Sequence, residues 1–88
     1  MPEEVKPKPA PLGEIKIVDM RKSPSLKAER VGKYDVHFTY MIGSEGPFMI
    51  SVPAEELEGK EFAEQAKIVR KYIEAEQSTR LMWRGATI

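Results

Sequence analysis

The residue best able to do acid–base chemistry near neutral pH is His37, the single histidine of the chain. Asp35 precedes it by two residues, and in an extended strand this spacing puts both side chains on one face. A carboxylate beside an imidazole is an arrangement that orients general bases in enzymes. A histidine beside an aspartate on an exposed sheet is far more often an ordinary surface pair. The pair alone therefore does not predict an enzyme.

Other patterns that carry chemistry are missing from the sequence. There is no cysteine, which excludes a thiol nucleophile, a disulfide and a cysteine-based zinc site. No second ligand lies at a recognisable metal-binding spacing from His37, and the sequence GSEG at 43–46 is typical of a hairpin turn rather than a phosphate-binding loop. The five glutamates of residues 54–64 lack the alternating oxygen ligands of a calcium loop. We expect no catalytic activity, no metal and no cofactor.

Charge is unevenly distributed along a chain whose formal net charge is zero. Residues 21–33 hold five basic residues against one glutamate, and residues 54–64 hold five glutamates against one lysine. The basic segment could contact a nucleic-acid backbone, although dedicated nucleic-acid binders usually carry a strongly positive net charge. Opposite charges on different regions could equally set the register of self-association. The cations of the nucleic-acid alternative are Arg21, Lys22, Lys27, Arg30 and Lys33.

Three segments alternate apolar and polar residues as strands do. Residues 14–20 predict a first strand, and a polar, basic connection follows as a loop or a short helical turn that Gly32 could end. Residues 34–52 predict a hairpin, because every second residue from Tyr34 to Ile42 is apolar and the pattern resumes at Phe48. A three-residue loop at 44–46 keeps the faces matched and places Ile42 opposite Phe48, with Gly46 in the left-handed conformation.

Pro53 ends the third strand, and residues 60–79 predict a helix. Its core face is expected to include Phe62, Ala66, Val69 and Ile73. The strand order and the single helix predict an α+β fold, a three-stranded antiparallel meander with one C-terminal helix packed on one face. The helix would cover the alternating apolar residues of the hairpin. They are Tyr34, Val36, Phe38, Tyr40, Phe48, Ile50 and Val52.

The other face of the predicted sheet is rich in methionine, whose flexible thioether suits an adaptable contact surface. It is expected to carry Val18, Met20, Met41 and Met49 beside His37. The apolar closing segment 81–88, a second copy of the chain, a different protein or water could cover it. The leading prediction is a small non-enzymatic module that binds a protein partner or itself, with Trp83 as anchor. Its contact residues would be Met20, Met41, Met49, Leu81, Met82 and Trp83.

The chain is expected to hold one domain, residues 14–88, after a proline-rich tail, residues 1–13. Pro7, Pro9 and Pro11 alternate in this tail, which is typical of semi-extended linkers. No run of apolar residues approaches the length of a membrane span, and the N-terminus lacks the features of a signal peptide. We therefore expect a cytoplasmic protein that does not enter a membrane.

Overall fold

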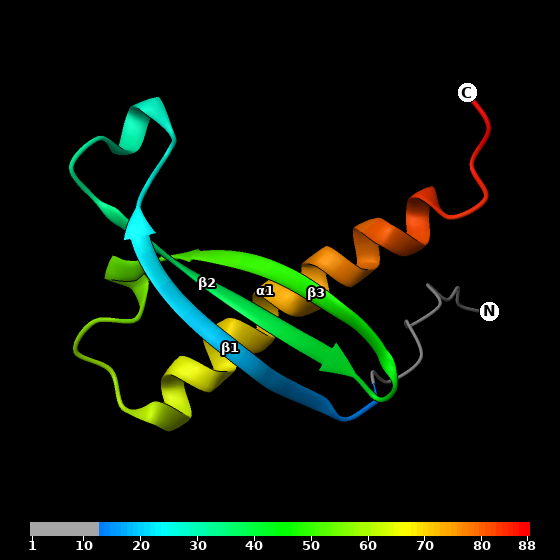
Figure 1. Ribbon diagram of the computed structural model, residues 1–88, viewed down its shortest axis with the longest axis horizontal. Coiled ribbons are helices and arrows are strands. Elements are labelled where there is room, and N and C mark those ends of the chain that lie inside the picture. The colour runs from blue at the N-terminus through cyan, green and yellow to red at the C-terminus, as the bar shows by residue number, and fades with distance from the viewer. Residues whose placement is uncertain (1–12) are drawn as a thin grey trace, which may run out of the picture.

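The computed structural model describes residues 13–88, so most of the predicted tail lies outside the described residues. Within these described residues, three strands form one antiparallel sheet in the order β1-β2-β3, and a single long helix crosses one of its faces (Figure 1). The strands are β1 (Ile15–Pro24), β2 (Tyr34–Ile42) and β3 (Glu45–Pro53), and the helix is α1 (Phe62–Trp83). The predicted α+β meander with one C-terminal helix is confirmed.

Two short 3₁₀ turns occupy the connections. The first, η1 (Ala28–Arg30), lies in the basic segment between β1 and β2, where either a loop or one helical turn was expected. The second, η2 (Ala54–Glu56), follows β3 directly and leads into the loop before α1. The helix extends four residues beyond the predicted end at residue 79, so part of the closing segment is helical.

A bulge at Val18 changes which residues of β1 share a face. Ile17 pairs with Tyr40, whereas Asp19 pairs with Thr39, so β1 contains one extra residue at this point. Beyond the bulge, Met20 pairs with Phe38 and therefore lies on the face that α1 occupies. The expectation that Met20 shares a face with Met41 and Met49 is wrong.

The hairpin between β2 and β3 has a tighter turn and a different register from those predicted. The turn is at Gly43 and Ser44, and Tyr40, not Ile42, pairs with Phe48. A bulge at Gly46 and Pro47 restores the match of the two faces. Gly46 has a φ of 124°, and a Cβ there would lie 3.1 Å from the carbonyl oxygen of Tyr40, so this bulge requires glycine.

The core lies between α1 and the β2–β3 half of the sheet. Tyr40, Val52 and Ile73 are the largest fully buried side chains, and Val69 packs with them. Two predicted core residues are exposed instead: Tyr34 at 48% and Phe62 at 83%. Ala66 is exposed as well, because the buried face of α1 is rotated toward Ile68, Val69 and Tyr72. The helix leaves β1 poorly covered, and Ile17 and Met20 are exposed on its side of the sheet.

Candidate functional site

His37 lies in a row of polar side chains that joins the three strands on the open face of the sheet. Its Nε2 is 2.8 Å from Ser23 Oγ, and its Nδ1 is 2.8 Å from Ser51 Oγ. In a neutral imidazole one of these nitrogens donates and the other accepts. Both ring nitrogens are therefore used in cross-strand hydrogen bonds. The His37–Asp35 pair that the strand spacing allowed does not form, because the Asp35 carboxylate binds Arg30 instead.

Arg30 is the centre of a charged cluster at one end of the sheet. Its Nη2 donates to Asp35 Oδ1 at 2.8 Å and to the Tyr34 carbonyl oxygen at 2.7 Å, and its Nη1 donates to Glu55. The Arg30 side chain is only 14% exposed, and Asp35 is the one buried charged residue among those described. The cluster ties η1 and β2 to η2, so the role of Arg30 is structural.

The pKa values of the cluster reflect this pairing. Hydrogen bonding to Arg30 lowers the pKa of Glu55 to about 2. Burial by itself raises the pKa of Asp35, but hydrogen bonds from Ser25 and Arg30, together with nearby positive charge, outweigh burial and lower that pKa. The pKa of the Arg30 guanidinium is raised, mainly by its hydrogen bond to Glu55. All three groups are therefore charged near neutral pH.

The structure does not gather the predicted nucleic-acid cations on one surface. Arg30 is used within the fold, and the Lys22 ammonium lies 5.5 Å from the centroid of the Tyr34 ring. In the register of β1 and β2, Arg21 lies opposite His37 on the open face of the sheet, whereas Lys22 lies opposite Val36 on the helix side. Lys27 and Lys33 are exposed in the connection between β1 and β2.

The six predicted contact residues are also divided among surfaces. Met41 and Met49 lie on the open face of the sheet, and Met20 lies on the opposite face. Leu81, Met82 and Trp83 form the last turn of α1, in the helix layer, and all three are exposed. The closing segment therefore does not cover the open face. The predicted contact set does not form one continuous patch.

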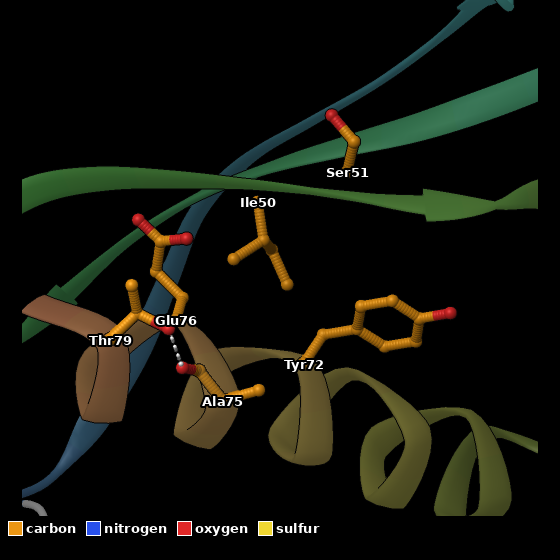
Figure 2. Close-up of a pocket in the computed structure, with 6 residues that line it drawn as sticks. All are labelled: Ile50, Ser51, Tyr72, Ala75, Glu76 and Thr79. Atoms are coloured by element: carbon orange, nitrogen blue, oxygen red, sulfur yellow. Dashed lines mark hydrogen bonds between the residues drawn. The ribbon is translucent and has the colours of Figure 1, made fainter. Parts of the chain in front are cut away.

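A groove runs between β3 and α1, and sequence reasoning did not identify it. Figure 2 shows Ile50 pointing from β3 toward the helix, with Tyr72, Ala75, Glu76 and Thr79 along the helix surface below it. The pocket here has a volume of about 250 Å³. Ala75 and Thr79 are small and exposed, so the helix surface is open to an extended chain beside β3.

The last turn of α1 continues this surface. Trp83 follows Thr79 by four residues and Glu76 by seven, so it lies one turn further along the same helix face. Leu81 is on the opposite side of the helix by the same spacing. Trp83 is 60% exposed. Of the three predicted contact residues in this turn, Trp83, the predicted anchor, and Met82, which follows Thr79 by three residues, thus lie beside the groove, and Leu81 does not.

β3 is an edge strand whose bulge and prolines lie only at its ends. Its centre, residues 48–52, has no charged residue and no bulge, and Pro47 and Pro53 bound it. The opposite edge, β1, carries a bulge together with Lys16, Asp19, Arg21 and Lys22, which are devices that discourage pairing with another strand. The uncharged run between two prolines was visible in the sequence, but its position at an open edge beside a helix was not.

Comparisons with protein-family models, curated protein sequences and solved structures gave no match. Within residues 13–88 there is no helix of sufficient length and apolarity to cross a membrane. The same residues contain no group of three or more histidine, aspartate or glutamate side chains placed to hold a metal ion. The groove beside β3 and the edge of β3 itself are the features with the clearest capacity to bind another molecule.

Proposed function

We propose that the protein is a small, non-enzymatic interaction module that binds an extended protein segment along the open edge of β3. The added strand would receive main-chain hydrogen bonds from β3, and its alternate side chains would enter the groove beside α1. Main-chain pairing supplies affinity in this mode of recognition, and the side-chain groove supplies specificity.

The observation that carries the proposal is the contrast between the two edges of one sheet. The edge at β1 has charges and a bulge along its length, whereas the edge at β3 has its bulge and prolines only at its ends and is uncharged from Phe48 to Val52. Two of the α1 residues beside this uncharged run, Ala75 and Thr79, are small. An exposed, uncharged edge strand promotes aggregation unless something pairs with it. A binding partner that pairs with β3 would explain why the centre of this edge strand carries no protective charge.

The proposed surface includes only some of the six contact residues predicted from the sequence. Met49 and Trp83 belong to the proposed surface, whereas Met20 lies on the far edge strand and Leu81 on the far side of the helix. Nucleic-acid binding stays a prediction with four of its five cations, since Arg30 is held by Asp35 and Glu55. The separation of Arg21 and Lys22 onto opposite faces does not favour it.

Selection of peptides from a displayed random library tests this proposal. Met49→Lys adds a charge to the edge of β3 without entering the core, and Met20→Lys is the matched control because both methionines are 59% exposed. We expect selected peptides to alternate apolar residues and to bind the Met49→Lys variant about tenfold more weakly than the wild type, a loss of about 1.4 kcal/mol. Met20→Lys should bind within about twofold of the wild type.

Fluorescence anisotropy with the synthesised peptides gives these affinities. The proposal fails if the library yields no binder to the monomeric chain, or if the Met49→Lys variant binds the selected peptides as tightly as the wild type does.

A further inference from the structure

We infer that the partner at the open edge is a second copy of this chain, with the two β3 strands pairing antiparallel to form a continuous six-stranded sheet. The inference rests on the proposed function, because it names the segment that the β3 edge binds. A two-fold axis near Ile50 would place Phe48 of one copy opposite Val52 of the other, and Met49 opposite Ser51. Such an interface is isologous, since the same surface is used by both copies.

The length of α1 supports a wider sheet than one chain provides. At 1.5 Å per residue, its 22 residues span about 33 Å. Three strands about 4.8 Å apart place the outer strands only about 10 Å from each other. Figure 1 shows that the last turn of α1 extends past β3. An additional strand beside β3 would lie over this turn and cover the Trp83 face.

The uncharged run of β3 is suited to pairing with itself. Residues 48–52 centre on Ile50, carry no charge that would repel its counterpart, and end at a proline on each side. Pairing about Ile50 joins residues 47–53 of the two copies, a stretch of about 23 Å, which leaves room for two antiparallel helices packed about 8–10 Å apart on the same face. Ala75 and Thr79 on the groove face of α1 are small enough for such an approach.

The charges at the N-terminal end of β3 balance within one copy. The Arg80 guanidinium lies 4.7 Å from the centroid of the Phe48 ring and 3.4 Å from a carboxylate oxygen of Glu76, and Glu45 and Arg84 carry opposite charges. At the C-terminal end, β3 leads directly into η2, where Glu56 accepts a hydrogen bond from the Tyr72 hydroxyl. Antiparallel pairing about Ile50 instead matches apolar residues on the helix face of both copies, Phe48 with Val52 and Ile50 with its counterpart. This self-complementarity favours a second copy over a foreign segment.

Light scattering after size exclusion, across a hundredfold range of protein concentration, tests the inference. We expect a mass of twice the 10.0 kDa chain at the upper end of the range. Met49→Lys should raise the dissociation constant about tenfold, and Met20→Lys should leave it unchanged. Trp83→Ala should weaken the dimer by at least about fivefold, whereas Leu81→Ala should not, because Leu81 faces away from the groove.

The double variant Met49→Lys/Ser51→Glu tests the register. Across the proposed two-fold axis each new lysine would face a new glutamate, so dimerisation should recover relative to Met49→Lys alone. A single-chain mass at every concentration overturns the inference, as does a dimer that Met49→Lys and Trp83→Ala leave unchanged. The peptide selection separates the two proposals: a monomer that binds extended peptides retains the proposed function and loses only the second copy, and a monomer that binds none loses both.

Discussion

Ile73→Ala should lower the free energy of unfolding by about 2–5 kcal/mol, because Ile73 is 1% exposed and its loss leaves a cavity between α1 and the sheet. The core of this small domain contains few large side chains, so such a loss is a large part of the total stability. Urea denaturation followed by circular dichroism measures it.

Leu81→Ala is the matched control for this prediction, since it removes an aliphatic side chain from the same helix at a position that is 52% exposed. Its cost should stay within about 0.5 kcal/mol. Ile73→Val, expected to cost about 0.5–1.5 kcal/mol, gives a measurable value if the alanine variant does not fold. Equal losses for Ile73→Ala and Leu81→Ala would show that α1 does not pack on the sheet as described.

Arg30→Met should lower the melting temperature at neutral pH far more than Arg70→Met does. Arg30 is the partner of the buried Asp35, which would be left without its guanidinium, whereas the exposed Arg70–Glu74 pair on α1 contributes only about 0.3–0.5 kcal/mol. Methionine retains most of the side-chain volume in both variants, so the comparison isolates the charge.

The effect of Arg30→Met should also depend on pH. The pKa values of Asp35 and Glu55 are lowered in the folded protein from ordinary values of 3.8 and 4.5. The carboxylates therefore contribute stability that is fully present above about pH 4.5 and is lost as the pH falls toward 2. Thermal melts between pH 7 and pH 2 should show the wild type converging on Arg30→Met. A gap between the two melting temperatures that stays constant down to pH 2 would contradict the role assigned to the Arg30 cluster.

The alternation of apolar and polar residues was enough to predict the overall architecture, but not the register in which the strands pair. A bulge adds one residue to a strand without interrupting the apolar pattern. Neither the bulge at Val18 nor the bulge at Gly46 and Pro47 could therefore be predicted from the sequence. The predicted pairing of Ile42 with Phe48 was displaced by two residues from the observed pairing of Tyr40 with Phe48. A shift of two preserves the faces of both strands, which is why the β2 and β3 faces were predicted correctly and that of Met20 was not.

The Arg30 cluster and the groove could not be predicted from the sequence, because both are formed by residues that lie far apart in the chain. Arg30 is 25 residues from Glu55, and nothing in the basic segment distinguished it from Lys27 or Lys33. The groove likewise brings β3 beside the second half of α1, about 25 residues later. Trp83 was predicted to be an anchor because it is a large aromatic residue. Its position on the groove face depends on the extension of α1 to residue 83, which was not predicted.

Amide hydrogen exchange along the two edge strands tests the central claim most directly. In an edge strand, alternate N–H groups point away from the sheet and exchange with solvent unless another strand pairs with them. At the high concentrations used for NMR spectroscopy, we predict that the outward amides of β3 exchange as slowly as those bonded to β2, while the outward amides of β1 exchange rapidly. Protection at β3 should fall on dilution. Equally rapid exchange of outward amides at both edges, at the highest concentration reached, would contradict pairing of β3 with a second copy.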